Sequence, residues 1–189
     1  MIYVKWALRI LFWVVAVGLL HYTLPQTDMV RITDTNTKRI DFTGFNAMFY
    51  SSPSSRSAEK LQTRDIYFIH GIRRNGRPIV YRNEDTGWGW PPYFKFDTAD
   101  LYTRAGDLIS DAEDPKWVAV RHYGWRIRIL SVFPNATSLR LVDNPDKLIV
   151  PWLSMLILAG IVAVYWMIRV RWVRFRKNRI DPLLDKWTR

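Results

Sequence analysis

The sequence contains no cysteine, and this absence excludes several kinds of site at once. Disulfide bonds, thiolate metal sites and cysteine nucleophiles are impossible, so packing and hydrogen bonding must hold the fold. A chain without cysteine is compatible with both reducing and oxidising compartments, so this absence does not indicate the compartment of the protein. Two catalytic signatures are also missing, since no serine lies in a Gly-x-Ser-x-Gly motif and no glycine-rich phosphate loop occurs.

Histidine is scarce, with 3 in 189 residues. His21 ends an apolar segment, His70 opens a predicted hairpin connection and His122 lies in a predicted strand. No HxxxH or HxH spacing joins them, so we predict no metal site and no cofactor. One catalytic hypothesis stays open, in which His122 acts with Asp65 or Glu84 across a sheet.

The net charge of +11 is concentrated at the chain ends. Residues 1–21 carry +2 and residues 169–189 carry +6, which leaves +3 for residues 22–168. A basic tail directly after an apolar span is typical of the cytoplasmic side of a membrane. We do not expect the protein to bind nucleic acid, since motifs that read the grooves of a nucleic acid are absent. The residues expected at the anionic lipid surface are Arg169, Arg171, Arg174, Arg176, Lys177 and Arg179.

Two uncharged segments are long enough to cross about 30 Å of hydrocarbon. They comprise 18 residues (10–27) and 21 residues (148–168). Starting the first helix near Trp6 gives it adequate length, with Arg9 reaching the headgroups. A cleavable signal peptide is the rival interpretation of the N-terminus, but no small-x-small cleavage site follows. We therefore predict transmembrane helices over residues 6–24 and 148–168.

The basic residues that flank these spans predict their orientation. Lys5 and Arg9 precede the first span and the basic tail follows the second, so both termini are expected in the cytoplasm. The prediction is a multi-pass protein of a bacterial inner membrane. It has a cytoplasmic N-terminus (1–5), a periplasmic domain (25–147) and a cytoplasmic tail (169–189).

The central segment has the patterns of a folded α+β domain. Strands are expected at 29–33 and 38–42 around a turn at 34–36, and at 64–69 and 77–81 around the hairpin pair Asn75-Gly76. Apolar residues at helical spacing after Asp97 predict one amphipathic helix, and residues 51–57 predict a loop. Further strands are expected at 116–120, 123–130 and 137–142. The predicted fold is a membrane α+β protein, in which a two-helix hairpin holds a mostly antiparallel sheet with one helix packed on it.

The most unusual segment is residues 81–97, which combines glycine, proline, carboxylates and aromatic rings. Packing in the core or docking on the membrane explains it, but aromatic faces also stack on sugars, and paired carboxylates serve glycoside hydrolysis. Adjacent residues of an extended chain point to opposite faces, so Glu84 and Asp85 are not expected to face one substrate. The candidate ligand-binding residues are Trp88, Trp90, Tyr93, Trp125, Glu84, Asp85 and His122.

Three strings of residues carry a resemblance to a known family: 81–97, 117–125 and 133–136. They resemble the domain of unknown function 1523 family of alphaproteobacterial membrane proteins. The resemblance extends over nearly the whole chain, from residues 21–25 after the first span to residues 179–182 in the tail. It implies the compartment and topology given above, and it transfers no catalytic residue.

From these patterns we expect a non-enzymatic accessory or scaffold protein. Its partners would be the lipid bilayer and either another membrane protein or a second copy, and Ala159, Gly160 and Ala163 offer a small-residue face for helix contact. The alternative is a periplasmic module that binds a glycan or small ligand through its aromatic residues.

Overall fold

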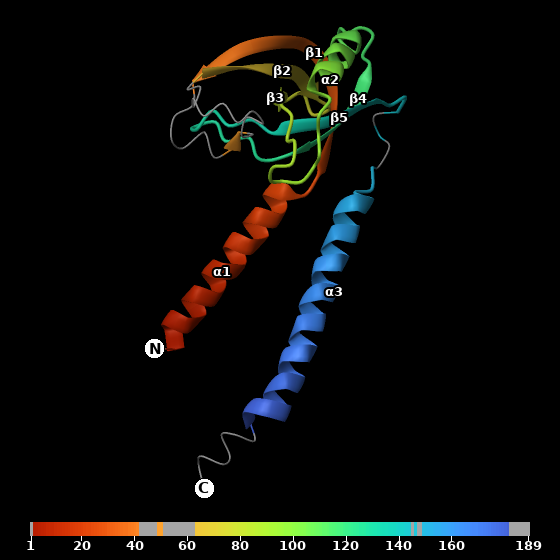
Figure 1. The fold of residues 1–189 in the computed structure, drawn as a ribbon. Coiled ribbons are helices and arrows are strands. Elements are labelled where there is room, and N and C mark those ends of the chain that lie inside the picture. The colour runs from red at the N-terminus through yellow and green to blue at the C-terminus, as the bar shows by residue number, and fades with distance from the viewer. Residues whose placement is uncertain (1, 42–48, 51–62, 145, 147–148, 182–189) are drawn as a thin grey trace. The chain divides into compact units, whose positions relative to one another are not determined.

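The computed structural model describes residues 2–41, 49–50, 63–144, 146 and 149–181, so the predicted loop at 51–57 lies outside the described residues. The chain forms two compact units, Met1–Ile149 and Val150–Arg189. The first holds a five-stranded barrel with helices α1 (Ile2–Thr23) and α2 (Thr98–Asp107) (Figure 1). The second holds helix α3 (Trp152–Phe175), which continues into one π-helical segment, η2 (Arg176–Ile180).

The barrel closes in the order β1-β2-β3-β5-β4. Every neighbouring pair is antiparallel except β3 and β5, which meet in parallel at Arg82 and Asn135. The predicted, mostly antiparallel pairing is therefore confirmed, while closure into a barrel was not predicted. The strands are β1 (Gln26–Asp41), β2 (Thr63–Arg73), β3 (Pro78–Asn83), β4 (Trp117–Tyr123) and β5 (Asn135–Leu141).

The length of β1 makes closure possible, and it corrects one prediction. Instead of two strands around a turn at 34–36, β1 is one strand of 16 residues. Its first part pairs with β4 over residues 26–31 and its later part pairs with β2 over residues 30–41. Asp34 and Asn36 favour turns, but pairing with His70 and Phe68 outweighs that preference, and a bulge after Ile32 absorbs the irregularity.

A second correction concerns residues 123–130, which do not continue as a strand. Strand β4 ends at Tyr123 because Gly124 has a φ of +90°, a conformation that favours glycine. The chain then forms a short hairpin in which the backbones of Ile127 and Val132 hydrogen-bond to each other in both directions. The alternation of apolar and basic residues in this segment therefore did not correspond to a long strand.

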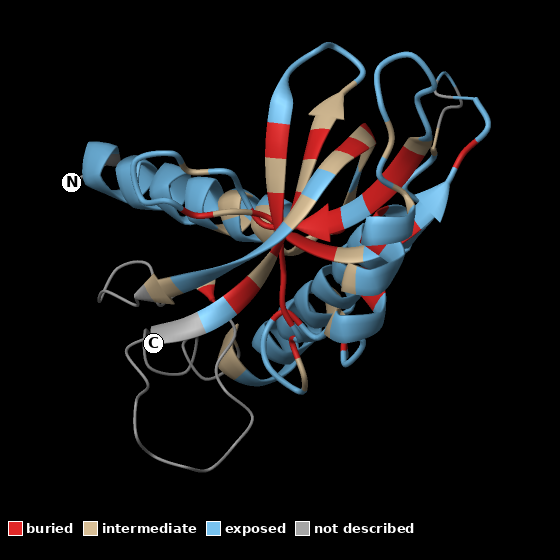
Figure 2. Cartoon of the chain, turned by 90° about the horizontal axis from the view of Figure 1, so that it is seen from above, coloured by how far each residue is buried: buried red, intermediate tan, exposed pale blue. Residues whose placement is uncertain are grey.

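The barrel core is made of inward-facing aliphatic residues from every strand, and Figure 2 shows this burial concentrated on the strands. The predicted amphipathic helix is confirmed as α2, which buries Leu101 and Ala105 against this core. The predicted hairpin around Asn75-Gly76 is also confirmed, with Gly76 at a φ of +75°.

Helices α1 and α3 differ from the barrel because their apolar side chains remain exposed. By length and composition both could cross a membrane, with mean hydropathies of 1.7 and 2.1 for their apolar stretches. At most 6% of either stretch is buried, unlike the core helix of a soluble protein. The observed helices begin and end at positions that differ from the predicted spans, since α1 starts at Ile2 and α3 runs to Phe175.

Candidate functional site

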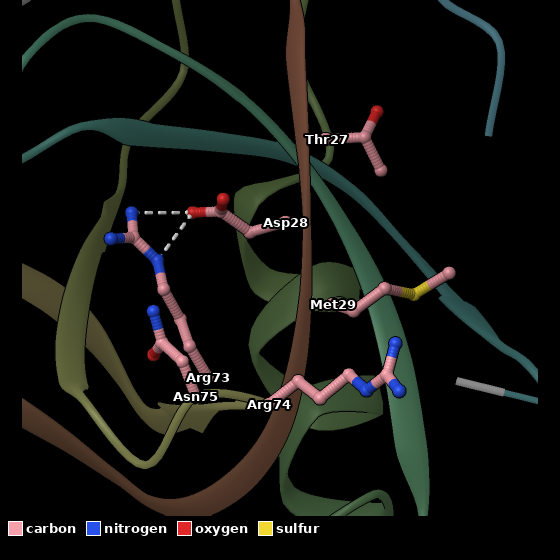
Figure 3. Close-up of a pocket in the computed structure, with 6 residues that line it drawn as sticks. All are labelled: Thr27, Asp28, Met29, Arg73, Arg74 and Asn75. Carbon is pink, nitrogen blue, oxygen red and sulfur yellow. Dashed lines mark hydrogen bonds and ion pairs between the residues drawn. The ribbon is translucent and has the colours of Figure 1, made fainter. Parts of the chain in front are cut away.

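One carboxylate oxygen joins four strands of the barrel. Asp28 Oδ2 on β1 accepts hydrogen bonds from Arg73 on β2, whose Nε lies at 3.1 Å and Nη2 at 2.8 Å (Figure 3). It also accepts from the Tyr81 hydroxyl on β3 at 2.6 Å and from His122 Nε2 on β4 at 3.1 Å. A carboxylate can only accept, so the proton in this last bond belongs to His122. We call these four residues the Asp28 cluster.

Strand alternation explains why these residues meet. Asp28 is in phase with the buried residues Val30 and Ile32, and His122 is in phase with Val120. All of them therefore point to the barrel interior. Asp28 was not predicted as a site residue, although its position in phase with inward-facing aliphatic residues was an available signal.

The bonds of the Asp28 cluster keep its carboxylate ionised. Burial alone would raise the pKa of Asp28, but bonds from His122, Tyr81 and Arg73 outweigh it and hold that pKa well below its usual value. Burial and the neighbouring Asp28 charge raise the pKa of Tyr81 well above its usual value, so Tyr81 keeps its proton as a donor.

A pocket of about 410 Å³ lies beside this cluster, lined by Thr27, Asp28, Met29, Arg73, Arg74 and Asn75 (Figure 3). Its two arginines are each paired with an aspartate, Arg73 with Asp28 and Arg74 with Asp146. His122 is only 3% exposed and does not line the pocket. The Asp28 cluster therefore has the geometry of a structural link between strands, because its charges are already paired with each other and its imidazole is buried.

The catalytic hypothesis for His122 named the wrong partners. Asp65 pairs with Arg39 at the surface at 3.3 Å, and Glu84 pairs with Arg82 at 3.2 Å, whereas His122 bonds to Asp28. Within the described residues, no three histidine, aspartate or glutamate side chains lie close enough together to hold a metal ion.

A second buried polar group occupies the region where β3 and β5 meet. Arg82 and Glu84 form an ion pair whose side chains are 1% and 7% exposed. Lys95, also buried, donates from Nζ to Asn83 Oδ1, and Asn135 bonds the backbone of Glu84 through both ends of its amide at 3.0 Å. Burial lowers the pKa of Lys95 to about 8 despite the nearby carboxylates. We call these five residues the Lys95 cluster.

The predicted opposition of Glu84 and Asp85 agrees with their burial, since Glu84 is buried and Asp85 is exposed. Asp85 Oδ1 accepts from the backbone N–H of Thr98 at 3.1 Å and from its hydroxyl at 2.6 Å, at the first residue of α2. Asp97, the residue preceding the helix, makes no capping bond. Asp85 therefore stabilises the start of α2.

The loop between β3 and α2 presents two tryptophans to the outside. Trp88 is 85% exposed and Trp90 is 78% exposed. The ring of Trp88 lies edge-on to Phe94 at 5.3 Å and to Phe96 at 6.2 Å, so these aromatic residues gather together. Tyr93, from the same loop, points elsewhere and joins the residues described next.

Tyr93 and Trp125 fasten the barrel to the last turn of α1. Tyr93 stacks on Tyr123 at 4.7 Å and donates its hydroxyl to the Thr23 carbonyl at 2.5 Å. Trp125 donates from Nε1 to His21 Nδ1 at 2.8 Å. Tyr22 of α1 lies edge-on to both Tyr123 and Trp125. We call Tyr22, Tyr93, Tyr123 and Trp125 the α1 junction, and Figure 1 shows the loop after β3 reaching this end of α1.

The structure thus separates the residues predicted as one aromatic ligand site. Tyr93 and Trp125 belong to the α1 junction, Trp88 and Trp90 face outward, and His122 belongs to the Asp28 cluster. On α3 and η2, the basic residues that were expected at the lipid surface are exposed: Arg169, Arg171, Arg174, Arg176, Lys177 and Arg179.

Comparison with known proteins agrees with the resemblance seen in the sequence. Residues 1–176 match the family described as protein of unknown function, DUF1523. An uncharacterised protein of Haemophilus influenzae is 37% identical over 139 residues, which cover 72% of this chain and 74% of that protein. No solved structure matches. Because the match runs through α1, the barrel and α3 up to residue 176, the chain belongs to the DUF1523 family.

Proposed function

We propose that this protein is a non-enzymatic scaffold or accessory protein of a bacterial inner membrane. In this proposal α1 and α3 cross the bilayer, both termini are cytoplasmic and the barrel is periplasmic. The barrel and the spans together bind another membrane protein or complex, and no cofactor takes part.

The observation that carries the proposal is the fixed, exposed position of Trp88 and Trp90. Their loop is held on both sides, by the bonds from Asp85 to α2 and from Tyr93 to α1. Ordered tryptophans on a surface lose little further freedom on binding, and tryptophan is enriched among the residues that dominate protein interfaces. An aromatic loop of this kind supports a contact with a protein partner.

The membrane placement rests on the exposed helices and their flanking charges. Lys5 and Arg9 lie near the start of α1, and six basic residues between 169 and 179 lie toward the end of α3 and on η2. This distribution favours a cytoplasmic location for both ends. The α1 junction favours retention of α1 as an anchor, because its Tyr22 packs among barrel residues.

The pairing of the charged side chains favours binding over catalysis. Asp28, Glu84 and His122 bond to neighbouring side chains of the barrel, and these bonds explain their positions. A catalytic acid or base must reach a substrate proton.

Site-specific photocrosslinking in cells tests the proposal. We expect a photoreactive residue at position 88 or 90 to capture one membrane protein, whereas the same residue at Arg77 on the exposed β2–β3 turn should not. Identical adducts from all three positions, or capture of this chain alone, would contradict binding to another protein. Single cysteines placed at Asn75 and Arg179 in this cysteine-free chain then test topology, since only the first should react with an impermeant maleimide from the periplasm.

A second candidate is a glycan-binding module, favoured by the gathering of Trp88, Phe94 and Phe96. Exposed aromatic faces stack on sugar rings. In this case cell-wall glycan fragments should raise the melting temperature of the full chain, and Trp88→Ala should remove that rise. A melting temperature that stays constant over a wide range of fragment concentrations would eliminate this candidate.

A further inference from the structure

An apolar groove runs along one face of α1 and ends at the barrel. It has a volume of about 730 Å³ and is lined by Ile10, Trp13, Val14, Val17, Gly18, His21 and Trp125. The helical residues form two rows spaced by four, 10-14-18 and 13-17-21, so they share one face of the helix. Gly18 contributes no side chain, and a Cβ placed there would lie 3.7 Å from the Trp125 ring. Trp125 therefore closes the groove at the C-terminal end of α1.

The closed end of the groove carries one polar group with a defined role. His21 Nδ1 accepts the indole N–H of Trp125, which can only donate. The proton of the neutral imidazole is therefore on Nε2, which makes Nε2 a donor. No hydrogen bond from Nε2 occurs within the described part of the chain.

Two cations follow Trp125 on the short hairpin of residues 125–132. Arg126 donates from Nη1 to the Val132 carbonyl at 2.9 Å and lies over the Phe133 ring. The Arg128 side chain is exposed and forms no ion pair with a described residue. Ile129 beside it is 95% exposed. An apolar tip next to free positive charge is suited to the headgroup region of a bilayer.

We infer that this groove and hairpin bind one acidic phospholipid. An acyl chain occupies the groove on α1, and the phosphate lies near His21 Nε2 and the arginines that follow Trp125. The inference rests on the proposed function, in that α1 must cross the membrane. Charge complementarity selects the occupant, because the groove accepts hydrocarbon, His21 Nε2 at its closed end offers a donor, and two arginines follow Trp125 in the chain.

The α1 junction makes this site part of the fold. The Gly124 N–H donates to the Tyr22 carbonyl at 2.9 Å, and Trp125 bonds His21, so the start of the hairpin is fixed to the last turn of the helix. The distance between the groove on α1, which holds the acyl chain, and the start of the hairpin, which lies near the headgroup, is therefore fixed. A bound lipid would link the membrane to the barrel at the point where the two meet.

Native mass spectrometry of the full chain released from nanodiscs tests the inference. With equal amounts of phosphatidylglycerol and phosphatidylcholine in the nanodisc, wild type should retain mainly phosphatidylglycerol. Gly18→Leu fills the groove and should abolish retention of either lipid. The matched control is Leu19→Phe, which adds bulk at the next residue of α1, an exposed residue outside the groove lining, and it should retain lipid like wild type.

Arg128→Gln tests the headgroup without altering the groove. Loss of one positive charge near a lipid surface should reduce the preference for phosphatidylglycerol about five-fold, the ratio that corresponds to about 1 kcal/mol. The Arg128 side chain has no bonded partner among the described residues, so this result does not depend on Gly18→Leu folding. Retention of the two lipids in equal amounts by wild type, which indicates annular lipid only, would overturn the inference.

Extraction of membranes with alkaline carbonate separates the two proposals. If the chain remains in the membrane but wild type shows no lipid preference, only the phospholipid site fails. If carbonate releases the chain, the proposed spans fail and the lipid site fails with them. Equal loss of lipid from the Gly18→Leu and Leu19→Phe variants would likewise overturn assignment of the site to the groove.

Discussion

The Asp28 cluster and the Lys95 cluster lie in the same barrel but balance their charges differently. In the first, one carboxylate takes bonds from a guanidinium, a phenol and an imidazole, and Asp28 and Arg73 are still 23% and 37% exposed. In the second, Arg82 and Lys95 are both buried with the single carboxylate of Glu84. The first pairs one carboxylate with one guanidinium, whereas the second holds two basic side chains with one buried carboxylate.

This difference indicates what each cluster does for the fold. Hydrogen bonds from β2, β3 and β4 to one residue of β1 fix the order of the strands on that side of the barrel. On the other side β3 and β5 pair at one position, Arg82 with Asn135, and buried polar side chains support that narrow connection. Buried ion pairs add little net stability, but removing one member leaves an uncompensated charge.

The largest expected effect is that of Glu84→Gln. The substitution keeps the size of the side chain but leaves Arg82 buried without its paired carboxylate, which should cost about 3–5 kcal/mol of unfolding free energy. Denaturant unfolding of the full chain in detergent measures this. The matched control is Asp85→Asn, which preserves the capping bond to α2 and should change stability by less than about 0.5 kcal/mol. Equal effects at the two positions would show that burial of Glu84 is unimportant.

Asp28→Ala should rank second, at about 3 kcal/mol. It leaves the Tyr81 hydroxyl and His122 Nε2 without their acceptor, whereas Arg73 is partly exposed and regains water. Asp65→Ala is the control, because Asp65 pairs with Arg39 at the surface and should contribute less than about 1 kcal/mol. If Asp28→Ala cost no more than this control, the Asp28 cluster would not hold the strands together.

The fall in stability at acidic pH, which we call the acid limb of the stability curve, should be caused by protonation of Asp28. Its pKa in the folded protein is lowered, so its contribution is fully present above the unfolded pKa of about 4 and is lost as pH falls through the lower folded value. Thermal unfolding between pH 5 and pH 2 should show a fall of up to about 1.4 kcal/mol per pH unit from this group. Asp28→Asn should flatten that fall, and an unchanged acid limb in this variant would assign it to other carboxylates.

The sequence predicted those parts of the molecule that depend on local patterns. The helix at α2 followed from apolar spacing around Leu101 and Ala105, and the β2–β3 hairpin followed from Asn75-Gly76. Barrel closure could not be read in this way, because it depends on a strand whose two parts pair with different partners. Turn-forming residues within β1 even argued against that strand.

The candidate site shows the same limit. Composition marked the tryptophan loop as unusual, and Trp88 and Trp90 are the most exposed of its large hydrophobic residues. The residues that join elements distant in sequence were less visible: Asp28 and His122 are 94 positions apart, and Trp125 and His21 are 104 positions apart. In the sequence, only the alternation that places Asp28 on the same strand face as Val30 and Ile32 indicated that Asp28 faces inward. Alternation alone does not predict which residue it bonds.

The smallest effect, and the one that most directly contrasts the two clusters, is expected at alkaline pH. Burial lowers the pKa of Lys95 to about 8 in the folded protein, whereas the unfolded value is about 10.4. The folded state therefore binds fewer protons between these values, and stability should rise with pH from about 8 to 10, by no more than about 1.4 kcal/mol per unit. Above about pH 10 the raised pKa values of Tyr81 and Tyr93 reverse the trend, because the unfolded tyrosines ionise first.

Lys95→Met isolates this contribution. The variant removes the titrating group and should give a flat stability between pH 8 and 10, while its acid limb, which belongs to Asp28, should remain that of wild type. Asp28→Asn should show the reverse combination, a flattened acid limb and an intact alkaline rise. Loss of both pH responses in either variant would mean that the two clusters are coupled, and the barrel would then have to be treated as one polar network.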